Sequence, residues 1–425
     1  MCLTEPQCGT DLGLLKTKAV PKGDGTYEIT GQKIFITSGD HDLTENIIHL
    51  VLARTTDAPK GTKGISLFLV PKFEVSDDGV VGSRNGVSTN SIESKMGIKG
   101  SPTCVLNFEN SKGIMIGPEN KGLNSMFTMM NLERIVVGVQ GLGIAETAYQ
   151  NAVAYSKERK QGKANNSKNG ETDLIIKHAD IRRSLMNMKS IIEGQRSFAF
   201  WLSQQIDVSL SHDDKDVRGD ASNMVALLTP VIKSFFTDNG VEITNDAIQV
   251  FGGYGYTKDQ GIEQLFRDNR ITPIYEGTNS VQAIDLVYRK ISSEGIFENF
   301  IKSMDTEIKN YKNEKNLESF LNIFEKYKEI LVSFTKWMRE KINSNKDDAS
   351  AACNDYLKVL GYTALAFAWI KTLKISFEKQ NSNKEFYEDK INTGKYYFEK
   401  ILPRAQSHYV VGTSGSHTTM NAKFN

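Results

Sequence analysis

The spacing of apolar residues changes once along this chain, near Gly122. Before that point apolar residues form short runs of strand length, as in residues 27–36, 47–54 and 64–70, and glycine-rich turns separate the runs. After it they recur at helical spacing, as Met126, Met129 and Met130 do. Strands followed by helices, without alternation, are typical of the α+β class. We predict a β-sandwich or β-barrel domain over residues 1–115.

Helical spacing continues to the end of the chain but changes in composition near residue 297. Helices are expected over residues 176–206, 220–251, 260–267 and 280–296, with a kink at Pro230. Residues from about 297 onward are rich in Lys, Glu and Asn, and their last helix is expected at 390–402. We therefore expect a helical bundle over 116–296 and an extra C-terminal helical domain over 297–425.

The bulk composition excludes several classes of function. The net charge of +1 and the pI near 7.6 give no overall field that would favour nucleic acid or anionic lipid. Apolar runs are too short to span a bilayer. The four cysteines are scattered, without paired or metal-ligand spacing, which favours a reduced cytoplasmic setting and no metal site.

Glu276 is the candidate catalytic residue, in the stretch Arg-Ile-Thr-Pro-Ile-Tyr-Glu-Gly-Thr-Asn over residues 270–279. Partial desolvation by Ile274 and Tyr275 would suit this carboxylate to work as a general base near neutral pH. Gly277 allows a ligand or another backbone to approach closely. The alternative is an ordinary solvated loop carboxylate.

Four motifs in register support the catalytic interpretation. They are Thr-Glu-Pro-Gln-Cys-Gly-Thr-Asp (4–11), Lys-Ile-Phe-Ile-Thr-Ser-Gly (33–39), Leu-Glu-Arg-Ile (132–135) with Tyr-Ser-Lys-Glu-Arg (155–159), and the stretch around Glu276. Over residues 1–290 the chain resembles the acyl-CoA dehydrogenases, flavoenzymes that desaturate acyl-CoA thioesters between the α and β carbons. The family normally has a helical domain before these motifs, and that domain is missing here. The chain is then either a fragment or a form that has lost the domain.

The resemblance implies a role for each matching residue. Glu276 would abstract the α proton, and N5 of FAD would accept the β hydride. The implied FAD contacts are Thr4, Phe35, Thr37, Arg159, Gln161, Gln249, Gly252, Gly253 and Thr278; the implied substrate contacts are Thr10, Arg134, Tyr275 and Gly277. Gln249, Gly252 and Gly253 match residues that contact the FAD of a neighbouring subunit, which implies a homodimer or homotetramer.

Some of these assignments have alternatives in the sequence itself. Phe35 and Thr37 could be ordinary strand residues, and Arg134 could simply pair with Glu133 on a helix surface. The segment 159–163 is one residue shorter than in many relatives and lacks their Phe, so the flavin contact there is open.

The C-terminal extension and residues 38–46 resemble the subgroup that includes 3-methylmercaptopropionyl-CoA dehydrogenases. This resemblance implies 3-methylmercaptopropionyl-CoA or a medium- or long-chain acyl-CoA as substrate, and an electron-transferring flavoprotein as electron acceptor. Three other functions are compatible with the sequence: an acyl-CoA oxidase, a flavin-binding relative without catalysis, and an inactive fragment.

Overall fold

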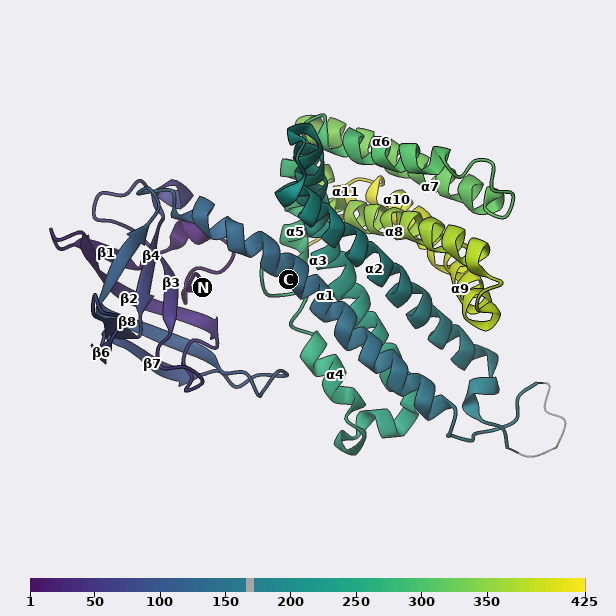
Figure 1. The fold of residues 1–425 in the computed structure, drawn as a ribbon, viewed down its shortest axis with the longest axis horizontal. Helices are drawn as coiled ribbons and strands as arrows, with labels where there is room; N and C mark the ends of the chain where they lie inside the picture. The colour runs from purple at the N-terminus through teal and green to yellow at the C-terminus, as the bar shows by residue number, and fades with distance from the viewer. Residues whose placement is uncertain (166–171, 425) are drawn as a thin grey trace. The chain divides into compact units, whose positions relative to one another are not determined.

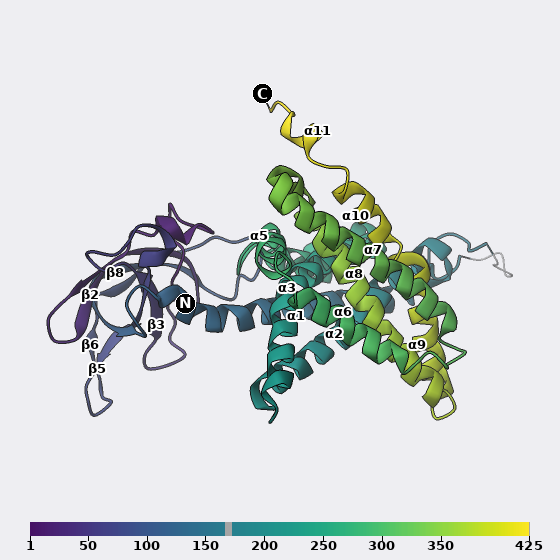
Figure 2. The same cartoon turned by 90° about the horizontal axis from the view of Figure 1, so that it is seen from above.

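The structure is a computed structural model that describes residues 1–165 and 172–424 (Figures 1 and 2). The chain forms two compact units, Met1–Glu133 and Arg134–Asn425. The boundary between them lies inside one long helix, α1 (Gly122–Ser156). Each unit has its own hydrophobic core.

The first unit is built on an antiparallel sheet with the strand order β1-β2-β8-β4-β3 and with β7 paired to β8. Its strands are β1 (Lys18–Pro21), β2 (Thr26–Thr37), β3 (Ile48–Ala53), β4 (Ser66–Pro71), β7 (Val87–Ile92) and β8 (Thr103–Ile116). Two more strands, β5 (Phe73–Val75) and β6 (Val81–Arg84), pair only with each other.

The two outer strands of this sheet meet at one end. Ala19 at β1 donates a backbone hydrogen bond to Arg54 O (2.7 Å), and Arg54 N donates to Thr17 O (2.9 Å). The sheet therefore curls and closes partly on itself, around buried side chains such as Ile29 and Phe68. This confirms the predicted β-sandwich or β-barrel architecture and, with the helical second unit, the α+β class.

The second unit is helical. Besides the rest of α1 it contains α2 (Ala179–Ser211), α3 (Lys215–Phe251), α4 (Ile262–Asn269), α5 (Asn279–Asp285), α6 (Ile296–Lys309), α7 (Glu318–Ser344), α8 (Lys346–Lys379), α9 (Lys384–Tyr396), α10 (Arg404–Gly412) and α11 (His417–Met420). Helix α3 runs through Pro230 as one continuous helix. The single helix expected over 280–296 is wrong: α5 passes into a π-helical turn, Leu286–Lys290, and α6 begins only at Ile296.

Residues beyond 297 pack directly on the preceding helices. The ring of Phe235 in α3 meets Tyr362 in α8 edge-on at 4.8 Å, and Trp369 Nε1 donates to Ser190 O in α2 at 3.0 Å. A single hydrophobic cluster therefore extends from Ile135 to Ala405. The division of this unit into the two predicted helical domains stays a proposal. No helix within residues 1–165 and 172–424 is long and apolar enough to cross a membrane.

Candidate active site

The predicted base lies in a tight turn between α4 and α5, residues 273–279, which we call the Glu276 turn. Asn279 N donates to Pro273 O at 3.0 Å and closes the turn. Glu276 has φ +55° and Gly277 has φ +85°. A left-handed conformation is uncommon for a non-glycine residue, and such backbone strain gathers at functional sites.

Two side chains hold the two successive carbonyl groups of this turn. Lys233 Nζ, from α3, donates to Gly277 O at 2.7 Å, and Gln282 Nε2, from α5, donates to Glu276 O at 3.1 Å. Lys233 is fully buried. Burial lowers the pKa of Lys233 to about 8, although the negative charges of Asp238 and Glu276 oppose the change. The carbonyl groups of the predicted base and of the residue after it are thus fixed by buried donors.

Two further predicted residues lie at the same turn. The Arg134 guanidinium is 4.0 Å from the position that a Cβ atom on Gly277 would occupy. Burial lowers the pKa of Arg134, and the charges of Asp285 and Glu276 act against that effect. The Tyr275 hydroxyl donates to Gln140 Oε1 in α1. Arg134 therefore lies beside the Glu276 turn, buried, rather than on a helix surface.

A second group of predicted residues lies near the far end of α1. Gly252, with φ +60°, ends α3 and starts the glycine-rich turn Gly252–Tyr256. The Arg159 guanidinium lies over the Tyr254 ring, 5.8 Å from its centroid. Gln249, Gly252 and Gly253 are exposed close by. The helical rise puts about 33 Å of α1 between Arg134 and Ser156, so this group is remote from the Glu276 turn.

Gln161 belongs to the segment that follows Arg159. Its carbonyl is 2.8 Å from His178 Nε2, and its amide donates to Asp173 O at 2.9 Å. These contacts fix the backbone of Gln161.

The first unit brings the two remaining motifs together. Ile34 N donates to Thr4 O at 2.9 Å. Beside this bond, Lys33 Nζ lies 2.9 Å from Glu5 Oε1, and both side chains are buried. The loop with Thr4 and Thr10 is therefore attached to the end of β2, where Phe35 and Thr37 lie.

Phe35 has an unusual conformation for a strand residue. It sits at a register shift between Lys33 and Ile36, with φ +59°, and its side chain is 59% exposed. Thr37 and Thr10 are exposed too. An aromatic ring held open to solvent by a strained backbone, with hydroxyl groups on the same loops, fits a flat ring ligand such as a flavin.

Sequence reasoning missed the residues that hold these loops. They are Lys233, Asn279 and Gln282 at the Glu276 turn, and the Glu5–Lys33 pair in the first unit. One signal was present: Lys233 is a lone charge inside the apolar run Val-Ile-Lys-Ser-Phe of α3. A buried lysine needs partners, so such a position marks a polar contact.

Comparison with known proteins places this chain in a family. Three family models match it: the acyl-CoA dehydrogenase middle domain over residues 1–111, the acyl-CoA dehydrogenase C-terminal domain over 120–291 and an acetyl-CoA dehydrogenase C-terminal-like region over 300–423. A 3-methylmercaptopropionyl-CoA dehydrogenase from Ruegeria pomeroyi is 45% identical over 69% of this chain and 50% of its own length. A butyryl-CoA dehydrogenase from Syntrophomonas wolfei is 35% identical over 95% of this chain and 69% of its own.

Solved structures agree with this result. An acyl-CoA dehydrogenase from Bacillus anthracis, complexed with FAD, shares the fold with a TM-score of 0.77 at 20% identity, over 99% of this chain and 70% of that one. The butyryl-CoA dehydrogenase of Megasphaera elsdenii gives a TM-score of 0.52 at 32% identity, over 67% and 66% of the two chains.

The chain belongs to the acyl-CoA dehydrogenase family, whose cofactor is FAD. It spans about half the length of several curated relatives that it matches, including the Ruegeria protein.

Proposed function

We propose that this chain carries out the α,β-dehydrogenation of an acyl-CoA thioester, with Glu276 as the base that removes the α proton. The observation that carries the proposal is the Glu276 turn itself. The backbone of Glu276 is left-handed, and side chains from α3 and α5 fix its own carbonyl group and that of Gly277. A rigid base costs little reorganisation when the proton moves.

The chain's own groups would share the work at the thioester. The Glu276 carboxylate takes the proton, and its backbone amide donates to the thioester oxygen, where negative charge develops. Tyr275 and Gly277 would border the acyl group, and the Arg134 side chain would contact the CoA part. Bound FAD supplies the acceptor for the β hydride.

The proposed FAD contacts are the residues that match the family's flavin motifs. Phe35 would stack on the flavin ring, with Thr4 and Thr37 as hydrogen-bonding neighbours, and Thr10 would contact the substrate. Arg159 is an exposed guanidinium, which suits a diphosphate, and Gln161 follows it. Thr278, the N-cap of α5, would be a further FAD contact close to Glu276 in sequence.

The proposed assembly is a homodimer or homotetramer. Gln249 lies about 24 Å along α3 from Lys233, which contacts the Glu276 turn, and this separation supports contact of Gln249, Gly252 and Gly253 with the FAD of a second copy. An electron-transferring flavoprotein is the proposed electron acceptor. A cytoplasmic location is proposed as well, since the four cysteines are all free and buried.

The proposed substrate is 3-methylmercaptopropionyl-CoA, with a medium- or long-chain acyl-CoA as the other candidate. Support comes from the 45% identity to the Ruegeria pomeroyi enzyme and from the match to the C-terminal-like family model. The name of the Ruegeria pomeroyi enzyme gives the substrate of that relative, so both acyl groups are tested on this chain.

An anaerobic absorbance titration of the purified chain with 3-methylmercaptopropionyl-CoA and with octanoyl-CoA tests this proposal. We expect the flavin band to bleach with one of them. Glu276→Gln should keep FAD and slow bleaching by a factor of about 10²–10⁴, the usual contribution of a general base. Glu294→Gln, an exposed carboxylate in the same unit, is the matched control and should bleach at the parental rate.

Each other result has a definite meaning. Parental bleaching by the Glu276→Gln variant would refute the base. A yellow protein that neither acyl-CoA reduces would contradict the proposed activity, and a colourless one would contradict FAD binding by this chain. Fast reoxidation of the reduced flavin in air would identify an oxidase.

A further inference from the structure

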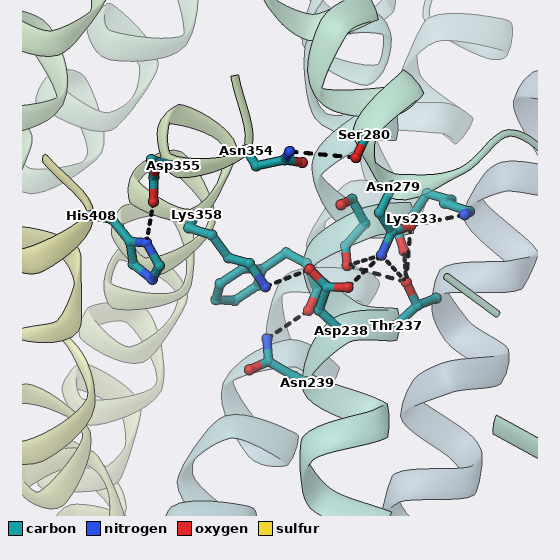
Figure 3. Close-up of polar contacts among 12 residues, drawn as sticks. Lys233, Thr237, Asp238, Asn239, Asn279, Ser280, Asn354, Asp355, Lys358 and His408 are labelled. Atoms are coloured by element: carbon teal, nitrogen blue, oxygen red, sulfur yellow. Dashed lines mark hydrogen bonds and ion pairs between the residues drawn. The ribbon is translucent and has the colours of Figure 1, made fainter. Parts of the chain in front are cut away.

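The C-terminal region reaches the Glu276 turn through one shared carboxylate. Lys358 in α8 forms an ion pair with Asp238 in α3, with Nζ 2.5 Å from Oδ2. The other oxygen of Asp238 accepts a hydrogen bond from Asn279 Nδ2 at 2.6 Å. Asp238 therefore connects Lys358, in the C-terminal region 297–425, to Asn279, which closes the Glu276 turn (Figure 3).

The contacts continue from Asn279 to the backbone beside the base. Asn279 Oδ1 accepts from Lys233 Nζ at 2.9 Å, and the same amine donates to Gly277 O at 2.7 Å. Asn279 Nδ2 also donates to Thr237 Oγ1 at 3.0 Å. We call Lys358, Asp238, Asn279 and Lys233 the Asn279 network. It orders the Asn279 amide so that its oxygen faces Lys233 and its nitrogen faces Asp238.

A second contact from α8 reaches the start of α5. Asn354, one helical turn before Lys358, donates from Nδ2 to Ser280 Oγ at 3.4 Å. The Lys358 ammonium also has an aromatic neighbour, since its Nζ lies over the Phe235 ring, 5.7 Å from the centroid. One face of α8 thus contacts both Ser280 and the partner of Asn279.

Burial makes the Asn279 network more than an exposed ion pair. Lys233 is fully buried and Asn279 is 9% exposed, so their polar atoms depend on protein partners. Asp238 and Lys358 are only partly exposed, at 31% and 24% of their side chains. If Lys358 loses its charge, Asp238 can turn toward water and the Asn279 amide loses its strongest acceptor.

We propose that Lys358 is a positioning residue for Glu276: through Asp238, Asn279 and Lys233 it fixes the carbonyl of Gly277 and so the direction of the base. The expected effect on catalysis rests on the proposed function, whereas the expected effect on the structure of the Glu276 turn does not. In this proposal the C-terminal region takes part in aligning the base, as well as in building the hydrophobic core.

Three variants of the 425-residue chain test the proposal. Lys358→Met removes the charge, and Lys358→Arg keeps it. Arg404→Met is the matched control, because Arg404 pairs with Glu242 of α3 at 2.9 Å, one helical turn beyond Asp238, without contacting Asn279. The first readout is hydrogen–deuterium exchange of peptides covering residues 274–280. The second is the separation of kcat from KM for the acyl-CoA that bleaches the flavin.

We expect Lys358→Met to speed exchange in the turn and to lower kcat, each by about threefold to tenfold, with KM changed by less than about twofold. Lys358→Arg should restore both, and Arg404→Met should change neither. Parental exchange and parental kcat in Lys358→Met, or equal effects in Arg404→Met, would overturn the proposal. If the parental chain bleaches with no acyl-CoA, the proposed function fails, while the exchange experiment still decides whether Lys358 holds the turn.

Discussion

Glu5 and Lys33 form the most buried ion pair of the first unit, at 3% and 0% side-chain exposure. Burial by itself would raise the pKa of Glu5, but the charge of Lys33 and hydrogen bonds from Thr17 and Lys16 outweigh it and lower the pKa to about 2. The pair joins the loop of Thr4 to the end of β2. Its removal should therefore affect both the stability of this unit and the geometry around Phe35.

Replacing one partner of this pair should be severe. Lys33→Met leaves the Glu5 carboxylate buried without its cation, and we expect a loss of about 3–5 kcal/mol in the free energy of unfolding. Urea unfolding of the chain measures it. Lys22→Met is the control, because the Lys22–Glu28 pair is exposed and should contribute less than about 1 kcal/mol. Equal losses in the two variants would contradict the structural importance of the buried pair.

The same carboxylate predicts a dependence on pH. The pKa of Glu5 is about 2 in the folded unit and 4.5 without its partners, so the folded state binds fewer protons between these values. Its stabilisation is complete above about pH 4.5 and is lost as the pH falls toward 2. Urea unfolding at pH 6, 4 and 3 should show this decline, and Glu5→Gln should show a shallower one. Parallel declines would assign the acid sensitivity to other groups.

At the scale of elements, the Glu276 turn depends on a glycine that follows the strained Glu276. Gly277 has φ +85°, and a Cβ atom on it would lie 2.8 Å from Gln282 Nε2, the group that holds the Glu276 carbonyl. Gly277→Ala should destabilise the chain by about 1–3 kcal/mol and slow flavin reduction. Thermal unfolding and stopped-flow bleaching measure the two effects.

A second glycine provides the comparison. Gly143 lies exposed in the middle of α1, and a Cβ atom there would meet nothing within 4 Å. Gly143→Ala should stabilise the helix by up to about 1 kcal/mol and leave flavin reduction unchanged. If Gly277→Ala behaves like Gly143→Ala, the conformation of the Glu276 turn is not essential.

Prediction from sequence succeeded where one element decides its own structure. The alternation over residues 27–36 predicted β2, and helical spacing predicted α2 and α3. It failed where the structure of a site depends on contacts between residues that are distant in sequence. Lys233 meets Gly277 across 44 residues and Lys358 meets Asp238 across helices, and no local pattern encodes such pairs. The left-handed conformations of Phe35 and Glu276 also need tertiary contacts to hold them.

At the scale of the whole molecule, the C-terminal region shares its core with the earlier helices of the second unit. Phe324, Leu331 and Trp369 belong to the same hydrophobic cluster as Ile191 and Phe235. A chain that ends at residue 295 would expose large apolar surfaces of α2 and α3 to water. We expect this truncated chain to lose cooperative thermal unfolding of the helical part and to bind a hydrophobic dye.

The control for this truncation removes only the residues after Met420. The described part of that tail, residues 421–424, is exposed, so its loss should leave the unfolding transition unchanged. A cooperative parental transition in the chain that ends at residue 295 would show that the helices before residue 296 form an independent domain.

The contact between Gly361 and Phe235 has a consequence for recombining this chain with its relatives. A Cβ atom on Gly361 would lie 2.6 Å from the Phe235 ring, so a larger side chain at position 361 of α8 requires a smaller one at position 235 of α3. A chimera that keeps α3 and takes α8 from another protein would work only where these two volumes match. The two helices should therefore be exchanged together, as one cassette, when hybrid enzymes are built.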